Sequence, residues 1–246
     1  MPTSAQEEAL APRRIIPMGD SAVTVEFGDS IDPTVNALVI SYTKKIREQD
    51  WSGIVDVVPT FRSVTIHFDP LQWDMASLAD HLRVLSCPCP SGTESSGTVH
   101  QIPVLYGGDY GPDLDEVAAW AGLEPSTVIR LHASVQYRVY MIGFSPGFPY
   151  LGLVPPQLTI PRLATPRPRV PAGSVGIADR QTGIYPIATP GGWRLIGRTP
   201  IPLYHRKGST PFLLKPGDQV LFRPITQDEF ERLSREVTDE YHRSQQ

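Results

Sequence analysis

Proline and glycine punctuate the second half of this chain and limit what it can fold into. The 246 residues include 26 prolines and 20 glycines, and after Phe144 the prolines alternate with short β-branched or aromatic runs, as in TIPRLATPRPRVPAGSVGIA (159–178). A proline lacks the backbone donor that helices and central strands need, and it restricts the residue before it. The pattern therefore predicts many short strands joined by tight corners, as in a barrel or a sandwich.

The first half of the chain follows a different pattern, in which helical and strand periodicities alternate. Two short strand-like runs precede Asp32-Pro33, which begins a helix whose apolar residues keep helical spacing. The runs at 54–61 and 63–69 alternate apolar and polar residues, as half-buried strands do. A second helical pattern begins at Met75. These elements predict a small α/β sandwich.

These patterns divide the chain into four parts. We expect a flexible tail (1–12), an N-terminal α/β domain (13–85), a linker rich in Ser, Gly and Pro (86–98), and a β-rich domain (99–246). The β-rich domain is expected to open with a strand, continue with two short helices that begin at Pro112 and near Pro125, and end in a helix. Thr226 and Glu229 have the spacing of a capping box ahead of that last helix.

Charge and composition argue against several functional classes. A formal net charge of −4 at pH 7 gives no reason to expect binding to nucleic acid or to an anionic membrane. The first residues lack the apolar core of a signal peptide, and no apolar run approaches the roughly 20 residues that span a bilayer. We therefore expect a cytoplasmic protein. The two cysteines, Cys87 and Cys89, are expected to be reduced linker thiols, since no second pair exists to complete a zinc site.

The segment GFSPG (143–147) matches the G-x-S-x-G signature of a serine-hydrolase nucleophile elbow. In that elbow the serine stands on a turn between a strand and a helix. Pro146 and the prolines and glycines after it follow Ser145 too closely for a helix to form. The only histidines further along the chain are His205 and His242. The sequence therefore predicts that Ser145 is not a nucleophile.

A second segment, GWRLIGRT (192–199), differs from a P-loop by having Arg198 where the P-loop has lysine. Its interior residues are typical of a strand, and Pro200 and Pro202 prevent a following helix. Nucleotide binding of the P-loop kind is therefore not expected. Arg198 can still contact an anion in another geometry, or pair with a nearby carboxylate.

Several long motifs, in the same order, resemble one known family. They are GFSPGFPYLG, PRLATPRPRVPAGSVGIA, QTGIYPIATPGGWRLIGRTP and PGDQVLFRPI, and similar segments cover nearly the whole chain. The family includes the 5-oxoprolinase B subunits, the allophanate hydrolase subunit 1 homologues and the sporulation kinase A inhibitor (KipI). The resemblance implies an α+β fold, in which a small N-terminal α/β domain is followed by a cyclophilin-like β-barrel domain.

The resemblance also implies a function within a complex. Members act as one subunit of a bacterial enzyme that opens 5-oxoproline to glutamate with ATP hydrolysis. The implied partners are two: a second cyclophilin-like (C-like) subunit, together with a separate barrel (A-like) subunit. ATP is implied for the complex as a whole, and the chain has no evident metal site or biotin attachment lysine.

An ATP-dependent opening of a lactam needs cations near the transferred phosphoryl group and backbone donors near the developing charge. The candidates for binding substrate or phosphate are Arg167, Arg169, Arg194, Arg198, Gly147, Gly191 and Gly192. The candidates for a cleft or an interface are Phe148, Tyr150, Gln181, Tyr185 and Trp193. Alternatively, the glycines are barrel corners, the arginines are surface charges and the aromatic residues are core, the interpretation we favour for Phe144. No catalytic residue is identified.

Two other functions remain open within the same family. One is inhibition of a histidine kinase by binding, as the family's sporulation kinase inhibitor does. The other is a part of a carboxyltransferase or allophanate-hydrolase-like complex. The sequence alone does not separate these alternatives from a role in 5-oxoprolinase.

Overall fold

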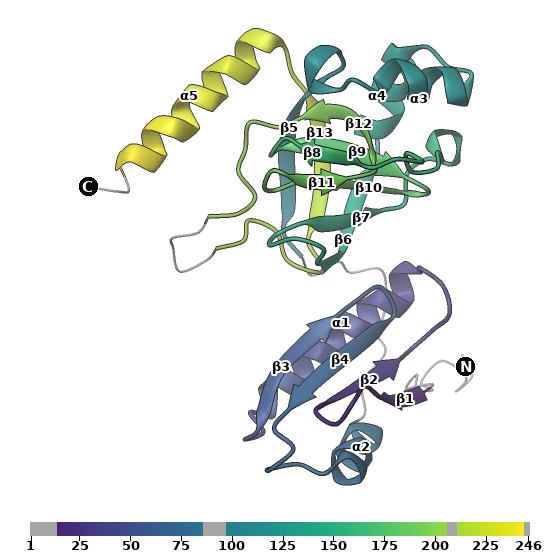
Figure 1. Cartoon of the computed structure of the whole chain (residues 1–246), viewed down its shortest axis with the longest axis vertical. Coiled ribbons are helices and arrows are strands. Elements are labelled where there is room, and N and C mark those ends of the chain that lie inside the picture. Colours follow the sequence, from purple (N-terminus) through teal and green to yellow (C-terminus); the bar gives the residue numbers. More distant parts are fainter. Residues whose placement is uncertain (1–13, 86–96, 206–210, 244–246) are drawn as a thin grey trace, which may run out of the picture. The chain divides into compact units, whose positions relative to one another are not determined.

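The computed structural model describes residues 14–85, 97–205 and 211–243, with the side chains of the last helix described as far as residue 239 (Figure 1). The chain divides into two compact units, Met1–Ser96 and Gly97–Gln246. The expected tail (1–12), the two cysteines and most of the expected linker lie outside the described residues. The predicted α+β class, a small α/β unit followed by a β-barrel, is confirmed.

The first unit is a four-stranded antiparallel sheet with two helices. The strand order is β1-β2-β4-β3. The elements are β1 (Arg14–Pro17), β2 (Ala22–Glu26), α1 (Pro33–Glu48), β3 (Ile54–Pro59), β4 (Ser63–Phe68) and α2 (Met75–Val84). Asp32 caps α1 as predicted, because its carboxylate accepts hydrogen bonds from the backbone N–H groups of Thr34 (2.8 Å) and Val35 (3.1 Å).

The core of the first unit lies between the sheet and the apolar face of α1. Leu38, Val39, Tyr42 and Ile46 of that face are buried, as their spacing predicts. The Tyr42 hydroxyl donates a hydrogen bond of 2.6 Å to the backbone oxygen of Leu82 in α2. This bond joins the two helices through a buried group that would otherwise be unsatisfied.

The second unit is a closed barrel of short strands. The order around the barrel is β10-β7-β6-β13-β5-β12-β9, and β8 and β11 form a separate two-stranded sheet. The strands are β5 (Val99–Tyr106), β6 (Gln136–Ile142), β7 (Pro149–Gly152), β8 (Arg167–Val170), β9 (Ser174–Ala178), β10 (Gln181–Ile184), β11 (Thr189–Gly191), β12 (Arg194–Arg198) and β13 (Gln219–Pro224). The strands from β7 to β12 have three to five residues each, which confirms the prediction from the proline and glycine pattern.

Three α-helices accompany the described part of the barrel. They are α3 (Leu114–Ala121), α4 (Pro125–Ala133) and α5 (Gln227–Arg243), with single 3₁₀ turns at Gly108–Tyr110 and Pro156–Leu158. The helix expected from Pro112 begins two residues later, at Leu114. Asp113 instead forms hydrogen bonds with Leu195 of β12, through both its carboxylate and its backbone N–H. Gly122 ends α3 in the left-handed conformation, at φ 64°. Among the described residues, no helix is both long and apolar enough to cross a membrane.

A buried histidine organises the polar part of the barrel core. His132, at the end of α4, has no exposed surface. Its Nε2 lies 2.9 Å from the hydroxyl of Thr182, which donates its own hydrogen to the backbone oxygen of Gly176, so Nε2 carries a hydrogen and donates. Its Nδ1 therefore accepts from the Tyr106 hydroxyl at 2.8 Å. The ring is neutral, and burial lowers the pKa of His132 to about 3.

This low pKa predicts that acid destabilises the barrel through His132. In the unfolded chain the imidazole has its ordinary pKa of about 6.5, so between pH 6.5 and 3 the unfolded state binds a proton that the folded state does not. Stability is therefore lost as pH falls through this range, by up to about 1.4 kcal/mol per pH unit. We expect His132→Gln to be less stable than the unchanged chain at pH 7, and that deficit to shrink between pH 6 and pH 4.

Urea unfolding at several pH values measures this deficit. The fluorescence of Trp120 and Trp193 reports on the barrel when Trp51 and Trp73 of the first unit are replaced by phenylalanine. If the free energies of unfolding of the two proteins differed by the same amount at every pH between 6 and 4, the assignment of a neutral buried His132 would be contradicted.

Candidate functional site

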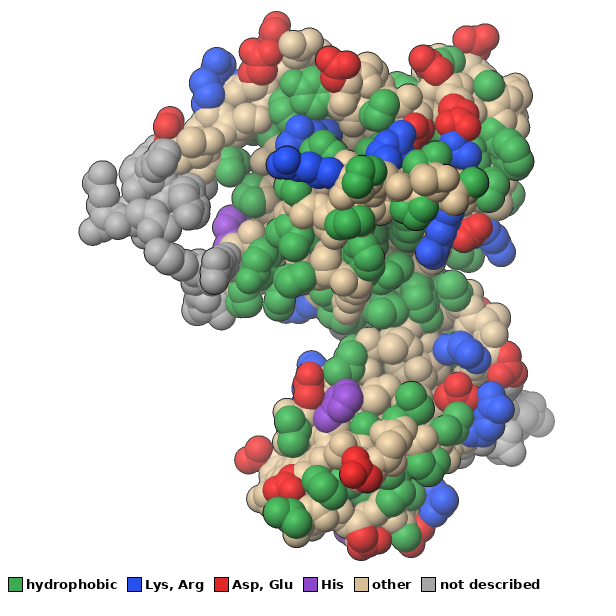
Figure 2. Space-filling model, viewed as in Figure 1, with side chains coloured by type: hydrophobic (Ala, Val, Ile, Leu, Met, Phe, Trp, Pro, Cys, Tyr) green, Lys and Arg blue, Asp and Glu red, His purple; other side chains and the backbone are tan. Residues whose placement is uncertain are grey.

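A cavity of about 300 Å³ opens on the barrel and gathers most of the aromatic candidates. We call it the aromatic cavity. Its lining residues come from the loops and strand ends around β6, β7, β10, β11 and β12. They are Phe144, Phe148, Tyr150, Arg162, Leu163, Pro166, Tyr185, Pro190, Gly191, Gly192 and Trp193. Figure 2 shows hydrophobic side chains gathered over the face of the barrel that carries β6, β7, β10 and β11.

Phe148 is the centre of the aromatic cluster that forms the cavity wall. Its ring is buried and meets four other rings edge to face, at centroid distances between 5.0 and 5.4 Å. These rings are those of Phe144, Tyr150, Tyr185 and Trp193. Edge-to-face contacts of this kind add about 0.5–1.5 kcal/mol each beyond the burial of apolar area, so they stabilise the packing of the wall.

The predicted glycines have different surroundings. A Cβ on Gly191 would lie 2.5 Å from the Tyr185 hydroxyl oxygen, so only glycine allows this ring to pack there. Gly147 has φ +81° and ends the turn between β6 and β7. A Cβ on Gly192 would meet its nearest atom, in Pro166, at an ordinary 3.6 Å. Packing and turn geometry therefore account for Gly147 and Gly191, while a Cβ at Gly192 would make only ordinary contacts with Pro166 and Leu163.

The loop before Phe148 presents an aromatic side chain to solvent. Phe144 is 62% exposed and has φ +62°, a left-handed conformation that is costly for a bulky residue. Our expectation that Phe144 is a core residue is therefore wrong, because the tight turn directs its ring to the mouth of the aromatic cavity rather than inward. The strained turn thus presents an apolar ring to solvent beside the aromatic cavity.

Ser145 lies in the same loop and lacks the context of a nucleophile elbow, as predicted. The turn continues into strand β7, and no helix directly follows the serine. The Ser145 hydroxyl is buried and has no hydrogen-bond partner among the described residues. No base therefore activates it in this conformation.

Two tyrosines and one arginine supply the polar groups of the aromatic cavity. Burial raises the pKa of both Tyr150 and Tyr185, and the positive charge of Arg162 opposes that rise. Both phenols therefore keep their protons at neutral pH. Arg162 lies at the rim, where it forms a loose 3.8 Å ion pair with the exposed Asp179. Its guanidinium therefore remains available to a ligand carboxylate.

The four predicted arginines lie outside the aromatic cavity. Arg167 pairs with the buried carboxylate of Asp113 at 2.6 Å, and Arg194 pairs with Glu116. Both arginines are thus engaged by carboxylates, an arrangement that the sequence analysis considered only for Arg198. Arg169 is exposed on β8, and Arg198 lines a separate cavity between the barrel and α5.

The segment that resembles a P-loop is a barrel strand. Arg194–Arg198 forms β12, which pairs antiparallel with β5 and β9, and no helix follows it directly among the described residues. The prediction that this segment is a strand without a directly following helix is confirmed. Gln181, another candidate, lies on β10 opposite Gly152, outside the residues that line the aromatic cavity. Its side-chain nitrogen is buried without a partner among the described residues.

Besides Phe144, the sequence analysis missed four residues that line the aromatic cavity: Arg162, Leu163, Pro166 and Pro190. All four lie in the proline-rich segments that carry the family resemblance, so the composition did mark the segments that line the cavity. Proline-rich loops have no fixed side-chain period, however, so spacing could not indicate which residues face a cavity.

The described lining of the aromatic cavity can bind a ligand but holds few groups for catalysis. It includes no histidine, cysteine, aspartate or glutamate, and its titratable groups are two protonated phenols and a guanidinium. Across the described residues, no group of three or more His, Cys, Asp or Glu side chains could hold a metal ion. A small flat anion fits this lining, with its ring against the aromatic wall and its charge at Arg162.

Comparisons with known proteins place these features in a family. Residues 13–214 match the family described as carboxyltransferase domain, subdomain C and D. The chain is 41% identical to the 5-oxoprolinase B subunit of Bacillus subtilis over 228 residues, covering 87% of this chain and 93% of that protein. It is 42% identical to the 5-oxoprolinase B subunit of Escherichia coli O157:H7 over 215 residues, covering 84% of this chain and 94% of that protein.

A solved structure shares the fold. The urea carboxylase of Kluyveromyces lactis matches with a TM-score of 0.72 at 22% identity, over 93% of this chain and 23% of that one. At this identity the likeness concerns the fold alone.

The environment of Ser145 generates a test with a chemical probe. Because its hydroxyl has no base beside it, we expect no covalent labelling of Ser145 when the intact chain is treated with a fluorophosphonate that reacts with activated serines. Peptide mass spectrometry after digestion measures the labelling. Stoichiometric modification of Ser145 would revive the hydrolase interpretation.

Proposed function

We propose that this chain, which belongs to the carboxyltransferase domain family (subdomains C and D), is the B subunit of an ATP-dependent 5-oxoprolinase. The complex would open 5-oxo-L-proline to L-glutamate. The observation that carries the proposal is the likeness to two 5-oxoprolinase B subunits over most of both chains. ATP use by the complex is consistent with a cytoplasmic location, which we also propose.

The chemistry of the reaction explains the need for ATP. The substrate is a five-membered lactam, an unactivated amide that water attacks slowly. Transfer of a phosphoryl group from ATP to the lactam oxygen would make the ring carbon electrophilic enough for water to add. The C–N bond of the resulting tetrahedral carbon would then break as its nitrogen takes up a proton, and hydrolysis of the acyl phosphate by a second water would release glutamate and phosphate. Such a site needs cations on the transferred phosphoryl group and an acid–base pair for the attacking water.

The aromatic cavity is our candidate for the lactam-binding site. At about 300 Å³ it is in the size range of small-ligand pockets. A five-membered ring can lie against the Trp193 and Phe148 wall, while the Tyr150 hydroxyl can bond with the lactam amide. The substrate carboxylate would pair with Arg162 at the rim.

The remaining groups would come from the partner subunits. The described lining of the aromatic cavity holds no carboxylate or imidazole to act as a general base, and the segment that resembles a P-loop is a strand. We propose that the two partners, the C-like cyclophilin-type protein and the A-like barrel protein, supply ATP binding and acid–base catalysis. The present chain would then bind and orient the lactam.

The Arg162 assignment predicts a selective loss of substrate binding. We expect Arg162→Gln to raise the KM for 5-oxoproline about tenfold or more, since a charge-assisted hydrogen bond to the substrate carboxylate is lost. The value of kcat should change less, because Arg162 does not touch the scissile bond. Steady-state kinetics of the complex reconstituted from its three subunits measure both constants.

Arg130→Gln is a matched control, because Arg130 is exposed on α4 and outside the aromatic cavity. It removes the same charge and should leave KM unchanged. An unchanged KM in Arg162→Gln, in a complex that assembles normally, would rule out this cavity as the carboxylate site while leaving the proposed place of the chain in the complex intact.

The division of labour predicts that activity depends on the partners. We expect the purified chain alone to show no appreciable release of ADP dependent on 5-oxoproline, and the mixture with both partner subunits to restore it. A coupled assay for ADP, with glutamate quantified in parallel, measures turnover. Full turnover by the isolated chain would contradict the proposal.

The same preparations separate the two alternatives. Inhibition of histidine-kinase autophosphorylation by the isolated chain, without 5-oxoprolinase activity in the mixture, would favour the kinase inhibitor. Carboxylation that depends on a biotin carboxylase, with no turnover of 5-oxoproline, would favour a carboxyltransferase-related role.

A further inference from the structure

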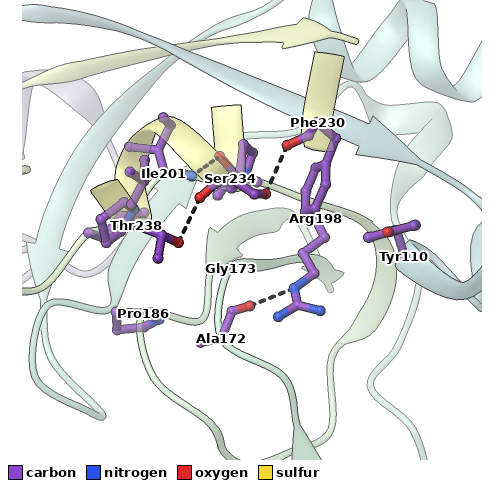
Figure 3. A pocket seen from close by; sticks show the side chains of 14 residues that line it. Tyr110, Ala172, Gly173, Pro186, Arg198, Ile201, Phe230, Ser234 and Thr238 are labelled. Atoms are coloured by element: carbon purple, nitrogen blue, oxygen red, sulfur yellow. Dashed lines mark hydrogen bonds between the residues drawn. The ribbon is translucent and has the colours of Figure 1, made fainter. Parts of the chain in front are cut away.

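A second cavity, of about 350 Å³, lies between the barrel and the C-terminal helix α5 (Figure 3). We call it the helix-side cavity. Phe230, Ser234, Val237 and Thr238 of α5 line one side, and the residues after β12 line the other. It shares no lining residue with the aromatic cavity. The proposed lactam site therefore leaves this cavity unexplained.

Arg198 brings a positive charge into the helix-side cavity. Its Nε donates a hydrogen bond of 2.8 Å to the backbone oxygen of Ala172, and Figure 3 shows the two terminal nitrogens outside that bond. The terminal nitrogens form no hydrogen bond or ion pair with any residue in the described part of the chain. Arg167 and Arg194 of the same barrel, by contrast, are paired with carboxylates.

The described lining of the helix-side cavity contains no other charged residue. A half-buried guanidinium that has no Asp or Glu partner attracts an anion. Its two terminal nitrogens match the two oxygens of a ligand carboxylate. One guanidinium balances one negative charge. A phosphate dianion would need further donors, so the lining favours a monoanion.

The hydroxyl groups of α5 do not supply such donors. The Ser234 hydroxyl donates to the backbone oxygen of Phe230 and the Thr238 hydroxyl to that of Ser234, both at 2.8 Å. Their hydrogens are therefore engaged within the helix (Figure 3). Arg198 is the only charged donor in the described lining, beside the neutral hydroxyls of Tyr110 and Thr199.

The other walls of the helix-side cavity are apolar. Phe230 is nearly buried and packs on Tyr110 at a ring distance of 4.7 Å, while Val237, Ile201 and Leu203 close the sides. A ligand that fills this space must carry an apolar body beside its charge, since a small hydrated ion would leave these walls unfilled. The lining is thus amphiphilic, with one charged end.

We propose that the helix-side cavity binds a small aliphatic monocarboxylate. Its carboxylate would lie on the terminal nitrogens of Arg198, and its apolar chain would lie between Val237 of α5 and Leu203 of the barrel. The site needs no second protein, so binding is testable on the full-length chain by itself. Its outcome does not depend on the 5-oxoprolinase assignment.

The test is a titration of the ¹⁵N-labelled full-length chain with hexanoate, followed by amide chemical shifts. We expect saturable shifts at Gly173, Thr199 and Ser234, with a Kd of about 1 mM or tighter. Hexanol, which has the same chain without the charge, should bind at least tenfold more weakly. Inorganic phosphate should also bind more weakly, because it cannot use the apolar walls.

Three variants and one control separate the charge from the shape of the site. Arg198→Gln should weaken hexanoate binding about tenfold or more, and Arg198→Lys should not restore it fully, because lysine lacks the planar pair of donors. Val237→Trp fills the helix-side cavity from α5 without changing Arg198 and should abolish binding. Arg235→Gln removes a charge from an exposed position of α5 outside the cavity and should leave binding unchanged.

Four results would overturn the proposal. They are the absence of saturable shifts at the three amides, equal affinity for hexanoate and hexanol, tighter binding of phosphate than of hexanoate, and unchanged binding in Arg198→Gln. If Arg198→Gln does not fold, Val237→Trp and the comparison of hexanoate with hexanol decide the matter.

Discussion

The buried carboxylate of Asp113 is the interaction on which the functional half of the barrel depends. One of its oxygens accepts from the backbone N–H of Leu195 and the other from the Arg167 guanidinium, both at 2.6 Å, while its own N–H donates to the Leu195 oxygen. The residue is only 5% exposed, and a charge at such depth is tolerated only when it is fully paired. Asp113 therefore joins the start of α3 to strands β8 and β12.

This arrangement positions the walls of both cavities. Strand β12 follows directly on Trp193 of the aromatic cavity and ends at Arg198 of the helix-side cavity. Strand β8, held by Arg167, pairs with β11 and so supports Gly191 beside Tyr185. Asp113 and Glu116 form ion pairs with Arg167 and Arg194, whereas Arg162 at the aromatic cavity has only a loose ion pair and Arg198 at the helix-side cavity has no carboxylate partner among the described residues.

Much of the fold could be predicted from local patterns. The helix after Asp32 begins where its capping residue and proline require, and the strands from β7 to β12 are as short as the proline spacing implies. The rejection of an elbow at Ser145 rested on the same steric argument, and strand β7 indeed follows the serine. The exposure of Phe144 was missed, because a turn with positive φ reverses the direction in which a side chain points.

The sequence by itself determined the element types, the family and the set of residues from which a site could be built. These depend on local sterics, on periodicity and on long motifs, all of which can be read along the chain. Only the tertiary structure decided which arginines are paired, since Arg167 and Asp113 are 54 residues apart and meet through barrel closure. The same closure, rather than any spacing, places Arg162 beside Trp193 and Arg198 beneath α5, because side chains distant in sequence become neighbours only when the strands pair.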